Sequence, residues 1–130
     1  MKFKTLMVIK AAVCLCLGIP ILLAPGFVYS IFGTTLNEGG YFAAREYGSS
    51  LIGNMLLTWL ARSAQESETR RAIILGMTFY NALGFIVTLS AIVSGALGPV
   101  AWLGLVIYLF FALGFGYFLI QPKRQAQASN

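Results

Sequence analysis

Four apolar runs, separated by short polar or small-residue segments, make up most of the chain. Each run is close to the roughly 20 residues that an α-helix needs to cross the hydrocarbon core of a membrane. We therefore predict an all-α polytopic membrane protein, a four-transmembrane-helix bundle with helices at about residues 5–23, 41–61, 72–93 and 100–120. Residues 1–124 would form this single membrane domain. Residues 125–130, which are Gln, Ala, Ser and Asn, would form a flexible polar tail.

The first run could be mistaken for a secretory signal, because lysines precede it. Its apolar stretch is longer than the usual 7–15-residue signal core, and no small-x-small cleavage site stands out before Pro25. We predict a retained first transmembrane helix. Pro20 should bend or loosen this helix near its end, because its ring removes one backbone hydrogen bond.

The positively charged side chains predict the orientation in the membrane. Segments 25–40 and 94–99 contain no Lys or Arg, and Arg45 is the one basic residue within a helix rather than beside one. Basic residues favour the cytoplasmic side. We therefore expect both termini in the cytoplasm. The basic residues on the predicted cytoplasmic side are Lys2, Lys4, Lys10, Arg62, Arg70, Arg71, Lys123 and Arg124.

Composition excludes several function classes. Only 10% of residues are charged, whereas soluble domains average about 25%. The net charge of +5 comes from residues beside apolar runs rather than from a basic face, so we predict a lipid bilayer and no nucleic acid as partner. The chain has no histidine, which removes His-ligated metals and imidazole catalysis. We expect no catalytic residues, no cofactor and no metal site.

The two cysteines, Cys14 and Cys16, stand two residues apart in the first apolar run. This spacing points them to nearly opposite sides of a helix, so they cannot readily bridge each other. We interpret them as small buried apolar side chains. A lipoprotein or redox role is the alternative.

A cluster of polar side chains interrupts the second apolar run. They lie on two neighbouring lines along the surface of a helix. One line contains Arg45, Ser49 and Gly53, and the other contains Glu46, Ser50 and Asn54. Charges in hydrocarbon cost roughly 2.5–3.5 kcal/mol unless they pair, snorkel or face protein. One interpretation is a polar anchor that sets helix depth and packing. The other is a shallow polar pocket below the aromatic segment 27–32, suited to a small anionic or amphipathic ligand or a partner's helix end.

Asn54 and Asn81 stand at nearly equal distances from the charged turn near Glu66 and Ser67. If the second and third helices form an antiparallel hairpin, the two amides lie at the same depth and should form an interhelical hydrogen bond. Participation of both in a translocation path is the alternative. Small residues at four-residue spacing, as in Ser49 and Gly53, favour close helix packing either within the bundle or between copies.

The motifs ARExGSSLIGNMLLTWLAR and RRAIILGMTFYNALG, with a PGF-type aromatic loop before them and a Gly/Phe-rich run after them, resemble small bacterial four-helix membrane proteins of the DoxX-like kind. The resemblance covers most of the chain. It implies a four-helix bundle in the inner (plasma) membrane of a bacterial cell, and it supplies no catalytic residue. The motifs of fluoride channels and the first-span glutamate of small multidrug transporters are both missing.

We expect an integral membrane protein without catalysis that serves as an accessory or assembly subunit of a larger membrane complex. The alternative is a small oligomeric transporter or channel that uses the polar face of the second helix, as a homo-oligomer. An enzyme acting on a lipid or quinone ranks below both, because no nucleophile–base pair or metal cluster is present. The candidate residues for a polar pocket or for helix–helix contacts are Arg45, Glu46, Ser49, Ser50, Asn54 and Asn81.

Overall fold

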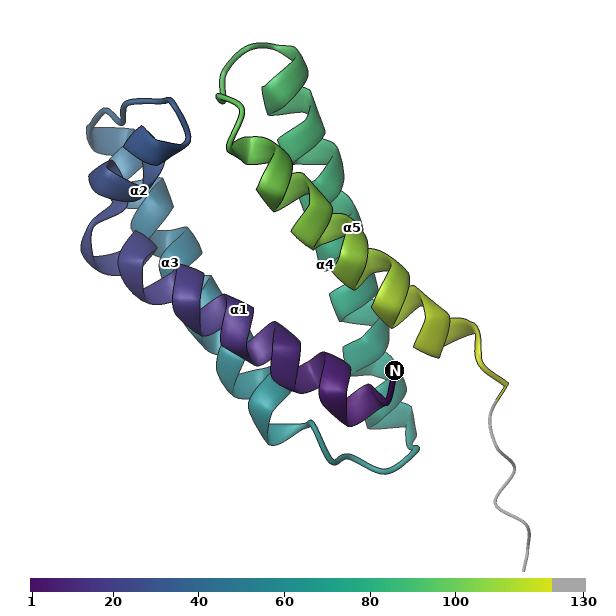
Figure 1. Ribbon diagram of the computed structural model, residues 1–130. Coiled ribbons are helices and arrows are strands. Elements are labelled where there is room, and N and C mark those ends of the chain that lie inside the picture. The colour runs from purple at the N-terminus through teal and green to yellow at the C-terminus, as the bar shows by residue number, and fades with distance from the viewer. Residues whose placement is uncertain (123–130) are drawn as a thin grey trace, which may run out of the picture.

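The computed structural model describes residues 1–122, and within that range every regular element is an α-helix (Figure 1). This confirms the predicted all-helical class. The predicted tail at 125–130, together with Lys123 and Arg124, lies outside the described residues. The elements are α1 (Phe3–Leu23), α2 (Pro25–Ile31), α3 (Glu38–Leu60), α4 (Glu68–Val93) and α5 (Ala101–Ile120).

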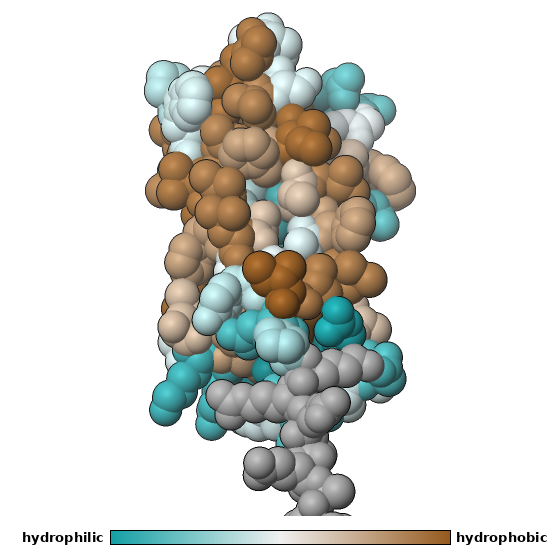
Figure 2. Space-filling model, turned by 90° about the vertical axis from the view of Figure 1, so that its right-hand side faces the viewer, coloured by the Kyte–Doolittle hydropathy of each residue, from teal (hydrophilic) through white to brown (hydrophobic). Residues whose placement is uncertain are grey.

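Three of the helices, α1, α4 and α5, are long and apolar enough to cross a membrane. Helix α3 has 23 residues, but its polar side chains leave it outside that group. Apolar side chains cover most of the middle of the face seen in Figure 2, and hydrophilic ones lie mainly toward its two ends. An apolar surface of this kind indicates a membrane protein, because soluble monomers rarely expose large apolar patches.

Local sequence signals explain where the helices begin. Asn37 caps α3 by accepting a hydrogen bond from the backbone N–H of Gly40 at 2.7 Å, and Ser67 caps α4 by accepting one from Arg70 at 3.1 Å. Helix α2 starts at Pro25, whose fixed φ suits the first helical position. Most of the aromatic segment 27–32 thus lies in a short helix. This helix ends at a turn where Gly33 has a φ of +78°, which glycine adopts at no steric cost.

The long helices pack as two antiparallel hairpins, and the consecutive helices α3 and α4 belong to different hairpins. Helix α3 lies against α1, with α2 at the far end of the pair, and α4 lies against α5. Glycines allow the first contact: a Cβ on Gly48 would lie 2.8 Å from the backbone nitrogen of Leu22, and one on Gly18 would lie 3.3 Å from the carbonyl oxygen of Gly48. The consecutive helices α3 and α4 are therefore not packed on each other.

Two apolar cores hold this arrangement together. The first joins α1, α4 and α5 near the amino terminus, at what we call the N-terminal end, and contains Phe3, Leu6, Met7, Ile74, Met77, Phe111 and Phe115. The second joins α1, α2 and α3 toward the opposite, α2 end, and contains Cys14, Ile21, Val28, Ala44 and Leu51.

The hairpins diverge from the N-terminal core and meet again at the α2 end. Figure 1 shows the two arms spreading apart along their length. At the α2 end, the backbone N–H of Gly98 donates a hydrogen bond to the carbonyl of Phe32 at 2.7 Å, which connects the loop before α5 to the end of α2. The space between the arms is thereby bounded at both ends.

Candidate functional site

The space between the hairpins contains a cavity of about 340 Å³. This volume lies near the lower end of the range for small-molecule sites, about 300–1,000 Å³. Its lining comes from all five helices and is mainly apolar. The polar members are one lysine, one threonine and four tyrosines, and they stand at Lys10, Thr88, Tyr29, Tyr47, Tyr80 and Tyr108.

Lys10 is the charged group of this cavity, and it is only 3% exposed. Its Nζ donates a hydrogen bond to Oδ1 of Asn81 at 2.8 Å. Asn81, which is fully buried, donates from its Nδ2 to the carbonyl of Met77 at 2.6 Å. The amide is thereby fixed with its oxygen toward the ammonium group. A charge-assisted hydrogen bond thus connects α1 to α4 across the two hairpins.

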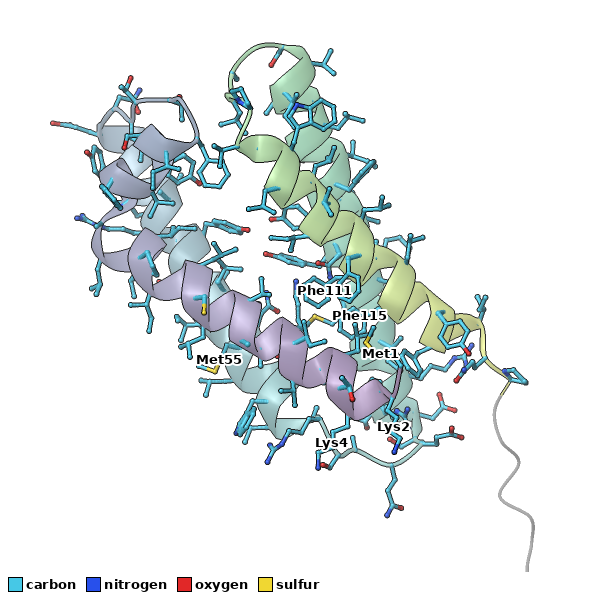
Figure 3. The ribbon with its side chains drawn as sticks, viewed as in Figure 1. Met1, Lys2, Lys4, Met55, Phe111 and Phe115 are labelled. Atoms are coloured by element: carbon cyan, nitrogen blue, oxygen red, sulfur yellow. The ribbon has the colours of Figure 1, made fainter. Side chains whose placement is uncertain are left out.

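Two aromatic rings also lie near the Lys10 ammonium. Its Nζ lies 4.5 Å from the ring centre of Phe111 and 5.2 Å from that of Tyr80. In Figure 3, Phe111 and Phe115 point from α5 toward α1. The negative face of an aromatic ring attracts a cation, and this attraction strengthens away from water. These contacts offset part of the cost of burying the charge.

The tyrosines form a second link between the hairpins. The hydroxyl groups of Tyr47, on α3, and Tyr108, on α5, share a hydrogen bond of 2.5 Å. Gly84 makes room for Tyr108, because a Cβ at that position would lie 2.3 Å from the Tyr108 ring. The Tyr80 ring lies 6.4 Å from that of Tyr108. The Tyr80 hydroxyl is buried beside the hydroxyls of Tyr47 and Tyr108, and it makes no hydrogen bond of standard geometry with the described residues.

The polar face predicted on the second helix does not line this cavity. Arg45, Glu46, Ser49 and Ser50 are exposed on the surface of α3 and are not among the residues that line the cavity. The serine hydroxyls donate back to the carbonyls of Arg45 and Glu46, each at 3.0 Å. No hydrogen bond or ion pair within residues 1–122 holds the Arg45 or Glu46 side chain.

The predicted hydrogen bond between Asn54 and Asn81 is wrong. Asn81 binds Lys10 and the Met77 carbonyl, whereas the Asn54 side chain has no hydrogen-bond partner in the described chain. The prediction assumed that α3 and α4 pack as a hairpin, but α3 packs against α1. Asn54 is half-buried, and beside it Gly53 has open space where a side chain would lie.

Lys10 was not predicted as a site residue, because it stands among the positive charges at the start of the first apolar run and was assigned to the cytoplasmic side. The structure places it inside α1, two turns beyond the helix start. A signal was present: Lys10, Cys14, Leu17 and Ile21 recur at spacings of three or four, and all four line the cavity. Cys14 is buried and Cys16 exposed, both as free thiols, so the expectation of burial is confirmed for Cys14 alone.

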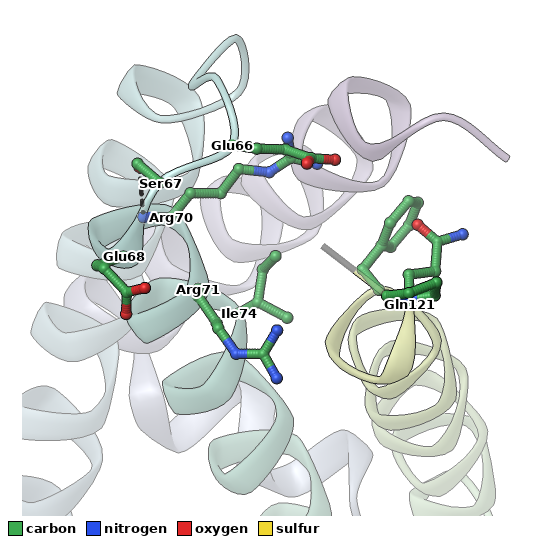
Figure 4. Close-up of a pocket in the computed structure, with 9 residues that line it drawn as sticks. Glu66, Ser67, Glu68, Arg70, Arg71, Ile74 and Gln121 are labelled. Carbon is green, nitrogen blue, oxygen red and sulfur yellow. Dashed lines mark hydrogen bonds between the residues drawn. The ribbon is translucent and has the colours of Figure 1, made fainter. Parts of the chain in front are cut away.

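A second cavity of about 330 Å³ lies at the N-terminal end, between the start of α4 and the end of α5 (Figure 4). It contains charged side chains of both signs, including Glu66, Glu68, Arg70 and Arg71. Its lining extends to Pro122, the last residue that the structure describes. The inter-hairpin cavity is therefore the better defined of the two.

Within residues 1–122 no group of three or more Cys, Asp or Glu side chains is arranged to hold a metal ion. Comparisons of the chain with protein-family models, with curated proteins and with solved structures find no match. The function is therefore argued from the geometry alone.

Proposed function

We propose that this protein is a non-catalytic, accessory or assembly subunit of a membrane complex, with four spanning helices and both termini in the cytoplasm of a bacterial cell. Helix α3 would be the fourth span. In support, α3 lies along α1, and its 23 residues give a length of about 34 Å. A helix packed along a spanning helix of similar length crosses the same layer.

The distribution of charge supports the orientation. The amino terminus and the α3–α4 loop lie at the same end of the molecule (Figure 1). The basic residues of these segments and of the first turns of α1 and α4 are Lys2, Lys4, Arg62, Arg70 and Arg71. The connections at the α2 end carry no Lys or Arg. By the positive-inside rule, the N-terminal end faces the cytoplasm of the inner (plasma) membrane.

The observation that carries the assembly role is the unpaired amide of Asn54. The antiparallel contact of Gly18 with Gly48 sets the register of α1 and α3, and it places Asn54 near the level of Cys14, in the middle of α1. An amide without a partner at that depth is unfavourable in hydrocarbon. Interhelical hydrogen bonds of such amides contribute about 0.6–2 kcal/mol.

The surroundings of Asn54 suit a docked helix. Gly53 presents no side chain and has nothing within 4 Å of its Cβ position, and Ser49 lies one turn away on the same line. Small residues at this spacing let a second backbone approach closely. Arg45 and Glu46 lie about two turns from Asn54, near the level at which α1 ends, where a partner or lipid headgroups can pair them.

The proposed occupant is a transmembrane helix of another subunit, with a hydrogen-bonding side chain at the depth of Asn54. A second copy of this chain is the competing occupant, because Arg45 and Glu46 of two parallel α3 helices could pair reciprocally. That arrangement corresponds to the alternative function, an oligomeric transporter or channel built on the polar face of α3.

The test is site-specific photocrosslinking in native membranes. A photoreactive amino acid at Leu57, 42% exposed and one turn from Gly53, should form an adduct with one other protein that co-purifies at fixed stoichiometry. The same group at Phe79, 62% exposed on α4, is the matched control and should form none. Asn54→Leu should abolish both adduct and co-purification.

Each other outcome contradicts the accessory role. Adducts between two copies of this chain alone would support the oligomeric transporter or channel. Equal adducts from Leu57 and Phe79 would indicate random contacts in the membrane. No adduct from Leu57 would mean that the polar face of α3 contacts lipid and not another protein.

A further inference from the structure

The inter-hairpin cavity contains hydrogen-bond donors that the protein itself does not satisfy. An ammonium group has three N–H donors, and the oxygen that Lys10 contacts is Oδ1 of Asn81 at 2.8 Å. The buried Tyr80 hydroxyl makes no hydrogen bond of standard geometry with the described residues. Both groups line the cavity. Buried donors without acceptors are rare, and they indicate a partner that supplies oxygen.

The cavity also lacks a counter-charge for Lys10. Its described lining includes no Asp or Glu. The hydroxyls of Tyr47 and Tyr108 are engaged with each other at 2.5 Å. A buried charge without a partner of opposite charge is strongly unfavourable. The missing partner is therefore an anion with at least two acceptor oxygens, one for Lys10 and one for Tyr80.

The remaining lining is apolar and extends from Lys10 to the α2 end, with Leu17, Ile21 and Val28 as members. From Lys10 to Ile21 the helix rises about 16 Å. An extended chain gains about 3.5 Å for every three bonds, so this length has room for a chain of about fourteen bonds. The volume is the tighter limit, since about 340 Å³ corresponds to roughly eleven groups of 30 Å³ each, the share of a water molecule in the liquid.

We infer that this cavity is a binding site for a single-chain aliphatic carboxylate, such as a medium-chain fatty acid. The carboxylate contacts the Lys10 ammonium and the Tyr80 hydroxyl, and the hydrocarbon chain extends between the hairpins toward Val28 and Phe32. A two-chain phospholipid is too large for this volume. The site is independent of the proposed docking face, because Arg45, Glu46, Ser49, Ser50 and Asn54 do not line the cavity.

The first experiment compares three ligands that differ only in the head group. The full chain is placed in nanodiscs of phosphatidylcholine, and binding of decanoate, decanol and decylamine is measured by equilibrium dialysis against empty nanodiscs. Decanoate should bind at least about tenfold more tightly than decanol, as expected for one charge-assisted hydrogen bond. Decylamine should not bind above the empty-disc background. Equal affinities for decanoate and decanol would overturn the inference.

The second experiment uses variants. Lys10→Met should weaken decanoate binding at least about tenfold and leave decanol binding unchanged. Tyr80→Phe, which keeps the ring, should weaken decanoate binding by a smaller factor. Lys4→Met, at an exposed lysine of the same helix, is the matched control and should have no effect. Unchanged decanoate binding in Lys10→Met would overturn the assignment of the head group.

The third experiment does not depend on a variant that could fail to fold. Decanoate with a diazirine on its last carbon is photoactivated in the parent protein, and the labelled residues are mapped. Labelling should fall on Val28, Phe32 or Leu97, and excess decanoate should suppress it. Labelling at the N-terminal core, around Phe115, or labelling that decanoate does not suppress would contradict the proposed orientation and the site.

Discussion

At the scale of single residues, the contact of Lys10 with Asn81 decides how the two hairpins are held together. Asn81→Leu should lower the free energy of unfolding by about 1.5–3 kcal/mol, because the buried ammonium loses its oxygen acceptor. Lys10→Met should also destabilise the protein. The double variant should lose less than the sum of the two, by at least about 0.5 kcal/mol. Equilibrium unfolding in mixed detergent micelles measures all three, and additive losses would show that the two residues are not coupled.

Asn54 offers a matched comparison, since it is also an amide within a long helix. Asn54→Leu should change the stability of the isolated chain by no more than about 0.5 kcal/mol, because no hydrogen bond of its side chain is lost. The same unfolding assay measures this change. A loss as large as that of Asn81→Leu would mean that Asn54 has a partner within the chain. That result would remove the support for the proposed docking face.

At the scale of the helices, close backbone contact between α1 and α3 depends on glycine. Gly48→Ala should destabilise the protein by about 1–3 kcal/mol, because the new methyl group would meet the backbone of Leu22 and Gly18, which cannot move aside cheaply. Gly53→Ala is the control. It should be neutral or stabilise the helix by up to about 1 kcal/mol, since the site is open and alanine is the better helix former. Thermal unfolding in detergent distinguishes them, and equal effects would contradict the α1–α3 packing.

The three candidate membrane spans, α1, α4 and α5, could be predicted because a long apolar run leaves few alternatives to a membrane helix. Which helices pack against each other could not be predicted from the apolar runs. Sequential elements usually pack together, and this favoured an α3–α4 hairpin and the incorrect Asn54–Asn81 bond. The contacts of Gly18 and Gly48 instead bring α3 to α1. Helix α2 has seven residues, which is too short to show helical periodicity, so the sequence predicts only an aromatic segment there.

The cavity was missed for a related reason. Lys10 belongs to a lysine-rich amino-terminal segment, so a count of charges assigned it to the cytoplasmic flank, whereas the fold buries it beside Phe111 and Tyr80. The tyrosines come from α2, α3, α4 and α5, and nothing in their spacing along the chain shows that they meet. Their convergence depends on how the two hairpins are arranged, which is a property of tertiary packing.

At the scale of the whole molecule, the membrane topology depends on whether α3 crosses the membrane. Because α3 packs along α1, its two ends lie at opposite ends of the molecule. A cysteine at Thr35 should therefore react with an impermeant thiol reagent only from outside, and one at Gln65 only from the cytoplasm, in a background without Cys14 and Cys16. Both positions are exposed, and Gln65 leaves the Ser67 cap intact. Labelling of both cysteines from the same side would show that α3 does not cross. That result would contradict both the packing of α3 along α1 and the proposed docking face within the hydrocarbon.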